Sequence, residues 1–221
     1  ETCKEIIEHG YSSEGTGVRT RWQDGEEANY ISIVGVTNKY DVEKEFPMIT
    51  LRNNTKTVIN AIDEILWIWQ KKSNNINDLN SHIWDQWANE DGSLGKTYGY
   101  QLGKKYKFKT KEGIQEMDQV EYVLYLLKHD QASRRIMTNL FNHEELKDMN
   151  LEPCAYGTQW LVKEGKLNLI LNQRSQDMLA ANGWNTMQYA ALMHMFAQCA
   201  GLKVGTLTHN IGDCHIYDRH V

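Results

Sequence analysis

Two neighbouring segments in the second half of the chain carry the pattern of half-buried β-strands. Residues 158–162 have the composition of one strand, and residues 167–172, Leu-Asn-Leu-Ile-Leu-Asn, have the alternating pattern of a half-buried strand. The turn signal at residues 163–166, Lys-Glu-Gly-Lys, separates them, so the pattern predicts a β-hairpin. Because a hairpin brings the outer ends of its strands together, we expect Cys154, just before the first strand, to lie beside Arg174, just after the second.

Apolar residues at helical spacing predict four helices, at residues 3–9, 55–70, 118–129 and 185–200. Asp118 and Glu121 form a capping-box pattern at the start of the third helix. The fourth helix has few polar residues, so we expect it to be buried. Asn185 is its expected N-cap, and Gly201 marks its end.

Further strands are predicted at residues 29–36 and 136–141 and in the closing stretch of the chain. His215 and Tyr217 alternate on that closing strand and therefore share one face of it. Residues 103–117 are basic and poorly patterned, which predicts a surface loop. This mixture of elements favours an α/β or α+β domain.

Composition narrows the class of protein. A chain of 221 residues can form one domain with a sizeable core, and its formal net charge of -5 argues against a general nucleic-acid binder. Four cysteines without a C-x-x-C pair suit a reducing compartment and predict neither a disulfide framework nor a zinc site. The sequence shows no signal peptide and no bilayer-spanning apolar run, so we expect a soluble cytoplasmic protein that does not bind membranes.

Five short motifs occur in an order that matches a known family: Arg19-Thr20, Pro153-Cys154, Gln173-Arg174-Ser175-x-Asp177, Asn185 and His215-Ile216-Tyr217. The chain thereby resembles the folate-dependent thymidylate synthases of bacterial type over nearly its whole length. The resemblance implies an α+β fold with a large mixed β-sheet flanked by helices, and a homodimer in which two such sheets pack back to back. It also implies a single domain over residues 1–221 that lacks the C-terminal part of the family domain.

The resemblance implies an activity as well. It predicts reductive methylation of dUMP to dTMP, in which 5,10-methylenetetrahydrofolate gives the one-carbon unit and a hydride and leaves as dihydrofolate, without a metal. Cys154 matches the nucleophile, whose thiolate adds to C6 of uracil and makes C5 reactive. Such a cysteine needs a pKa lowered by nearby cations, and Arg174 is the expected cation. Glu64, which has no lysine or arginine at helical spacing, matches the catalytic acid/base, and Tyr98 matches the tyrosine beside the reacting carbon.

Further residues match the nucleotide-binding positions of the family. The phosphate ligands would be Arg19 (with Arg21 as a rival), Arg174, Ser175, the partner's Arg134 and the partner's Arg135. Adjacent residues on a strand point to opposite faces, so one chain cannot easily aim both members of the Arg134-Arg135 pair at its own pocket. Asn185 matches the amide that reads uracil, since a primary amide donates and accepts at once. The other matches are to the dUMP contacts Gln173, Asp177, His215 and Tyr217, of which His215 and Tyr217 would bind the sugar, and to the folate contacts Ile83, Trp84 and Asp177.

Other readings stay open at this point. By composition alone, the arginines could be solvated, Trp84 could be a packing residue and Asn185 only a helix cap. A dUMP hydroxymethylase, in which water captures the exocyclic methylene, would use the same nucleophile. A non-catalytic homologue could hold nucleotide or RNA, and binding of its own mRNA follows only by family analogy. Arg52 and Lys56 are both candidates for the folate glutamate tail, and the sequence does not choose between them.

Overall fold

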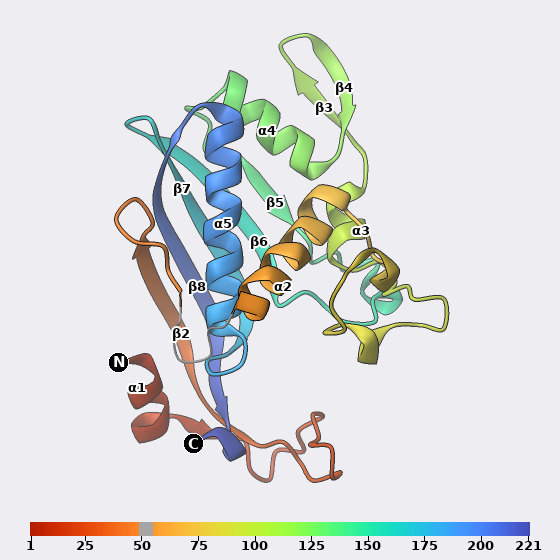
Figure 1. Ribbon diagram of the computed structural model, residues 1–221, viewed down its shortest axis with the longest axis vertical. Coiled ribbons are helices and arrows are strands. Elements are labelled where there is room, and N and C mark those ends of the chain that lie inside the picture. Colours follow the sequence, from red (N-terminus) through yellow and green to blue (C-terminus); the bar gives the residue numbers. More distant parts are fainter. Residues whose placement is uncertain (49–54) are drawn as a thin grey trace.

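A six-stranded mixed β-sheet forms the centre of the computed structural model, which describes residues 1–48 and 55–221 (Figure 1). The strand order is β1-β2-β8-β7-β6-β5, and every neighbouring pair is antiparallel except β7 and β8. The strands are β1 Tyr11–Ser12, β2 Tyr30–Asp41, β5 Met137–Asn139, β6 Ala155–Lys163, β7 Lys166–Asp177 and β8 Lys203–Tyr217. The expected mixed sheet flanked by helices is therefore confirmed.

Helices α4 and α5 lie against one face of this sheet, and α2 packs against α5 on the same side (Figure 1). Among the described residues, the α-helices are α1 Thr2–His9, α2 Thr55–Leu66, α3 Tyr98–Gly103, α4 Gln119–His129 and α5 Asn182–Ala200. Shorter helical turns are Ile76–Asp78, Asp85–Trp87, Leu146–Asp148 and Asp218–His220. Helix α5 is the crossover that the parallel pair β7 and β8 requires. Within the described ranges, no helix is long and apolar enough to cross a bilayer.

The predicted hairpin is present as β6 and β7, and both strands are longer than predicted. Glu164 and Gly165 have φ of 50° and 71°, the positive values that a tight two-residue hairpin turn requires. At the open end of the hairpin, Arg174 N donates a hydrogen bond to Cys154 O at 2.9 Å. The prediction that Cys154 lies beside Arg174 is therefore confirmed.

Two predicted helices are confirmed, with changes at their ends. The capping box at the start of α4 is complete, since Asp118 and Glu121 each accept from the other's backbone N–H. The predicted helix at residues 55–70 ends differently, because Trp67–Lys71 form a π-helical turn that continues α2. Such wide turns often adjoin functional sites.

The predicted N-cap of the buried helix α5 is wrong. The helix begins at Asn182, and Asn185 N donates to Ala181 O at 3.0 Å, which places Asn185 inside the first turn. The reason lies upstream. Asp177 Oδ1 accepts the N–H groups of Leu179 and Ala180, so this turn leads directly into the helix.

One loop assignment is corrected, and one argument about side-chain direction does not hold. Residues 103–117 contain a β-hairpin, β3 Tyr106–Thr110 with β4 Gly113–Met117, instead of a plain surface loop. One face of this hairpin is partly covered, with Phe108 stacked on Tyr122 of α4, and the other face is exposed. The alternation of aromatic residues and lysines at residues 106–109 is therefore a strand signal that the sequence prediction overlooked. The pair Arg134-Arg135 lies before β5, as the predicted strand at residues 136–141 implies, so the argument that strand neighbours point to opposite faces does not apply to it.

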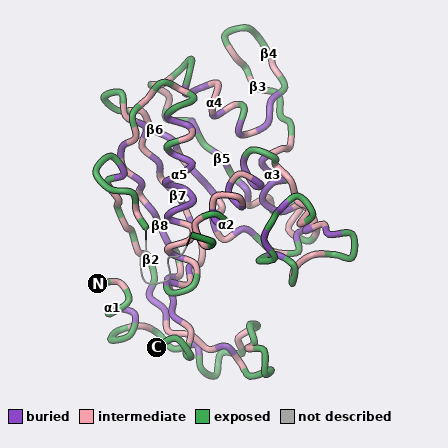
Figure 2. Tube along the Cα trace, in the orientation of Figure 1, coloured by how far each residue is buried: buried purple, intermediate pink, exposed green. Residues whose placement is uncertain are grey.

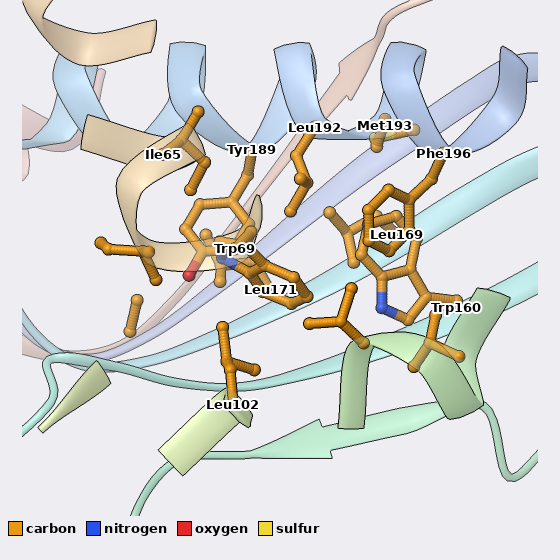
Figure 3. Close-up of a cluster of buried hydrophobic side chains, with 14 of the residues drawn as sticks. Ile65, Trp69, Leu102, Trp160, Leu169, Leu171, Tyr189, Leu192, Met193 and Phe196 are labelled. Atoms are coloured by element: carbon orange, nitrogen blue, oxygen red, sulfur yellow. The ribbon is translucent and has the colours of Figure 1, made fainter. Parts of the chain in front are cut away.

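The main core lies between α5, α2 and the helix-covered face of the sheet (Figure 3). Trp69, on the π-helical turn, makes edge contacts with Trp160, Tyr189 and Phe196. Trp160 stacks on Phe196 with the ring centroids 4.7 Å apart. The buried residues, purple in Figure 2, lie mainly along α5 and the strands β6, β7 and β8 beneath it. Losing such a tryptophan typically costs about 3–5 kcal/mol, so this packing fixes α2, and with it Glu64, against the sheet.

Candidate active site

Cys154 lies at the mouth of the hairpin, held by its own backbone. Its N–H donates to Tyr98 Oη at 2.8 Å, and its side chain is half-buried. Arg174 is fixed beside it, because its Nε donates to Pro153 O at 3.1 Å and its Nη2 to Glu152 O at 3.0 Å. A thiol and a guanidinium from opposite ends of the hairpin thus share one site.

The net effect of this environment on the Cys154 thiol differs from the expectation. Burial raises the pKa of Cys154 above its ordinary value, while the positive charge of Arg174 opposes that rise. Burial outweighs the cation, so Arg174 alone does not give the lowered pKa that the sequence predicts. A stable thiolate here needs additional positive charge or donors.

Glu64 is a buried carboxylate, 6% exposed, on the face of α2 that meets α5. It accepts hydrogen bonds from Trp84 Nε1 at 2.6 Å, from Gln188 Nε2 at 2.6 Å and from Trp184 Nε1. Burial raises the pKa of Glu64, and these three donors oppose the rise. No lysine or arginine among the described residues forms an ion pair with it, as its helical neighbours predicted.

Tyr98 lies between Cys154 and the buried side chain of Trp84. Its ring packs edge-on against Trp84, with the centroids 5.7 Å apart. Burial, and next the charge of Cys154, raise the pKa of Tyr98 well above 10. Its hydroxyl therefore stays a neutral phenol in hydrogen-bond contact with the Cys154 backbone.

Asn185 belongs to a row of side-chain amides in front of the sheet. Gln173 Nε2 donates to Asn185 Oδ1 at 3.3 Å, and Asn185 Nδ2 donates to Gln188 Oε1 at 3.4 Å. At the other end of the row, His209 Nε2 lies 2.9 Å from Gln173 Oε1. The amide is therefore bonded on both sides and only half-buried, which leaves one edge open to a ligand.

Apart from Arg174, the arginines assigned to phosphate lie on exposed segments. Arg19 is exposed on the loop after β1 and forms no ion pair within residues 1–48 and 55–221, whereas its rival Arg21 is 3.3 Å from Glu27. Arg134 and Arg135 are exposed and line an open pocket with Asp130, Ala132 and Ser133. Neither of their guanidinium groups pairs with a carboxylate of the described chain. Among the described residues, Arg19 therefore has no carboxylate partner and is available to bind phosphate, whereas Arg21 is paired with Glu27.

His215 and Tyr217 lie on one face of β8, as predicted, with their ring centroids 5.1 Å apart. His215 Nδ1 bonds Asp213 Oδ1 at 2.8 Å, which leaves Nε2 for a ligand. Trp22 packs edge-on against Tyr217, and its Nε1 donates to Asp218 Oδ1 at 3.0 Å. The loop that carries Arg19 is therefore tied to the end of β8.

Of the folate candidates, Ile83 and Trp84 lie near Glu64, and Asp177 lies at the end of β7. Ile83 is 37% exposed, while Trp84 is buried and donates its indole N–H to Glu64. Asp177 uses Oδ1 for the turn into α5, and its Oδ2 has no partner in the described ranges. Of the two candidates for the glutamate tail, Lys56 is exposed on α2 and Arg52 lies outside the described residues.

Sequence reasoning missed three polar residues in this site: Trp184, Gln188 and His209. Gln188 follows Asn185 by three positions on a predicted helix, a spacing that puts both on one face, so a signal existed. Trp184 and His209 acquire their roles only when α5 packs between α2 and the sheet, and nothing local indicates them.

Three comparisons relate this geometry to known proteins. The family model described as thymidylate synthase matches residues 1–221. A thymidylate synthase of Bacillus licheniformis is 49% identical, and thymidylate synthase 1 of Bacillus subtilis (strain 168) is 47% identical; each match covers 99% of this chain and 77% of the relative. Among solved structures, thermostable thymidylate synthase A from Bacillus subtilis superposes with a TM-score of 0.91 at 45% identity, covering 99% of this chain and 78% of that one.

Proposed function

The chain belongs to the thymidylate synthase family, and from that premise we propose how its own residues divide the reaction among them. The activity is the methylation of dUMP to dTMP, so the protein is a methyltransferase. Members of the family use methylenetetrahydrofolate as co-substrate. The comparisons favour neither a dUMP hydroxymethylase nor a non-catalytic homologue.

Cys154 is the proposed nucleophile. Its sulfur bonds to C6 of uracil, the C5–C6 double bond breaks, and the electron pair passes through C5 and C4 onto O4 as an enolate. The observation that carries this assignment is the Cys154 backbone held by Tyr98, with Arg174 fixed beside it. Because burial outweighs Arg174, the thiolate would depend on further arginines that arrive with the phosphate and the partner subunit.

Glu64 and Tyr98 are the proposed proton-handling groups. A carboxyl group whose pKa is raised by burial exchanges protons nearer to neutral pH than an exposed one. The C5 proton would leave through the Tyr98 hydroxyl and water held by Glu64. The half-exposed edge of Asn185 would donate Nδ2–H to the developing charge on O4 and accept uracil N3–H at Oδ1.

The remaining positions are proposed to hold the substrates. Arg19, Arg174, Ser175, the partner's Arg134 and the partner's Arg135 would bind phosphate. Gln173, Asp177, His215 and Tyr217 would complete the dUMP site, with the last two at the sugar. Ile83, Trp84 and Asp177 fit the folate because they place an exposed apolar side chain and an open carboxylate oxygen near the buried wall. The folate supplies the one-carbon unit and the hydride.

We further propose a homodimer formed through the sheet face that the helices leave uncovered. Along β7, residues on the helix side are buried and those on the opposite face are half-exposed. On β2, Val34 is 79% exposed. A second copy would cover this face and bring Arg134 and Arg135 to the neighbouring site. Residues 1–221 would act as one domain, and four free thiols suit the cytoplasm.

The experiment that tests the assignment is product analysis with dUMP labelled with tritium at C5. Incubation with 5,10-methylenetetrahydrofolate should release tritium and give dTMP and dihydrofolate in equal amounts. Formation of 5-hydroxymethyl-dUMP with tetrahydrofolate would instead indicate capture by water. Bound dUMP without tritium release would contradict the roles of Cys154, Tyr98 and Glu64 together.

A further inference from the structure

Gln188 bridges two parts of the site that have separate tasks. It is 2% exposed, and it lies on α5 one turn after Asn185, facing α2. Its Nε2 donates to Ala61 O at 3.0 Å and to Glu64 Oε2 at 2.6 Å, while its Oε1 accepts from Asn185 Nδ2. One side chain thus joins the buried carboxylate to the amide that faces the base.

These contacts fix the orientation of Gln188. A backbone carbonyl and an ionised carboxylate only accept hydrogen bonds. The NH₂ group of Gln188 must therefore point at Ala61 and Glu64, which leaves its oxygen toward Asn185. An amide oxygen only accepts, so Asn185 must present its Nδ2 to Gln188.

The opposite side of Asn185 is constrained in the same sense. Ser175 O accepts from Gln173 Nε2 at 3.0 Å, which sets the direction of the Gln173 amide, and the same nitrogen reaches Asn185 Oδ1. Gln173 Oε1 then needs a donor, so His209 carries its proton on Nε2. Burial lowers the pKa of His209 to about 4, which keeps this ring neutral. All donors along the row therefore run from His209 toward Glu64.

We propose that Gln188 is a positioning residue that locks the Asn185 amide in the orientation that binds uracil and rejects cytosine. The proposal rests on the proposed role of Asn185 in reading the base. An asparagine that is free to rotate by 180° about its last bond would bind either base. It would offer Oδ1 to uracil N3–H in one orientation, and Nδ2–H to cytosine N3 in the other. Only fixed neighbours make such an amide selective.

Because Gln188 also donates to Glu64, the same residue links base reading to proton transfer. Removing it takes one of three donors from the carboxylate and raises the pKa of Glu64 further. A merely structural glutamine would weaken every ligand alike and leave the pH dependence of the reaction in place.

The test is equilibrium binding of dUMP and of dCMP to Gln188→Met, which keeps the side-chain length and removes all three hydrogen bonds of Gln188. We expect the ratio of dUMP to dCMP affinity to fall about ten-fold, the effect of one lost hydrogen-bond constraint of ordinary strength. The acidic limb of the pH profile for tritium release from C5 should move to higher pH. Gln101→Met is the matched control, since Gln101 is 1% exposed and bonded to Lys96 O and Glu145 but is not part of the row. It should leave the ratio unchanged.

Two further variants separate the possible outcomes. If Gln188→Met does not fold, Gln188→Ala replaces it, because water in the space left behind donates or accepts equally and also removes the directional constraint. An unchanged affinity ratio in the folded Gln188 variant would overturn the proposal, as would equal weakening of both nucleotides. Asn185→Ala should lose the discrimination altogether. If it keeps the wild-type ratio, Asn185 does not read the base, and the assignment on which the proposal rests fails first.

Discussion

The base end and the phosphate end of the site are built in opposite ways. At the base end, Glu64, Gln173 and Gln188 are 6%, 3% and 2% exposed, and side chains of the same subunit hold each of them. At the phosphate end, Arg19 and Arg135 are exposed and form no ion pair within the part of the chain that the structure describes. Reading one base requires donors and acceptors fixed before binding, whereas a phosphate dianion needs charge that can close around it.

The two ends also differ in what they cost the folded protein. A buried carboxylate without a cation destabilises the native state unless donors compensate for lost water. An exposed arginine has almost no such cost. Function and stability are therefore in tension at the base end and nearly independent at the phosphate end, and four substitution experiments measure that difference.

Replacing Cys154, where the two ends meet, should have the largest effect. Cys154→Ala removes the atom that bonds to C6, so dTMP formation should fall by at least about 10⁴-fold. The affinity for dUMP, measured by calorimetry, should stay within a few-fold because neither the amide row nor the arginines change. Cys199→Ala is the control, since that thiol is exposed on α5. Turnover that survives in Cys154→Ala would remove the nucleophile assignment.

Paired substitutions on the loop after β1 test the phosphate end. Arg19→Ala should weaken dUMP binding by about 10- to 100-fold, because it removes a charged hydrogen-bond partner of the phosphate. The loss should shrink at high salt, and the free energy of unfolding should not change. Arg21→Ala breaks an exposed ion pair with Glu27, which contributes about 0–1 kcal/mol to stability, and dUMP binding should be unaffected. The reverse result would make Arg21 the phosphate ligand.

Mixing two inactive variants tests whether a second copy completes the phosphate end. Arg135→Ala and Cys154→Ala, each inactive alone, should regain about a quarter of wild-type activity after equal mixing and subunit exchange. Half of the dimers are then hybrids, and each hybrid has one unmutated site of two. Mixtures that never regain activity, although exchange is seen by mass spectrometry, would mean that the arginine pair serves its own subunit.

The smallest effect should be on stability at the base end. The folded-state pKa of Glu64 lies above the ordinary 4.5, so its contribution to stability is complete below that pH and is lost as the pH rises through the raised pKa. Urea unfolding of the wild type and of Glu64→Gln should therefore show the wild type losing stability relative to the variant as the pH rises above 4.5. Parallel curves as the pH rises would contradict the raised pKa.

The parts of the molecule that sequence could predict are those set by local patterns. Strand β7 alternates, and the turn before it needs positive φ, so the ends of the β6–β7 hairpin, Cys154 and Arg174, could be placed side by side. The hairpin at residues 103–117 was missed although its first strand alternates between aromatic residues and lysines, because the alternation is short and only one face is partly covered. The start of α5 was misplaced because Asp177, eight residues before Asn185, organises the turn.

The surroundings of Glu64 and Cys154 were predicted only in part, because they depend on residues distant in the sequence. Glu64 was recognisable because no cation lies at helical spacing, yet its donors Trp184 and Gln188 come from α5, more than a hundred residues away. The pKa of Cys154 was predicted in the wrong direction because a sequence shows the nearby arginine and does not show the extent of burial. Tertiary packing decides both.

The hairpin has a consequence for the order in which the site forms during folding. Arg174 and Pro153 are 21 residues apart, whereas Gln188 and Glu64 are 124 residues apart. Closing the longer loop costs about 1.5 kcal/mol more in chain entropy, so we expect the nucleophile to meet its arginine before the carboxylate meets its donors. Pulse-labelled hydrogen exchange should find the amides that join β6 to β7 protected earlier than those of α2. Early protection of α2 would reverse this order. In the expected order, the folding chain holds the Cys154 thiol in place while Glu64 is still open to water.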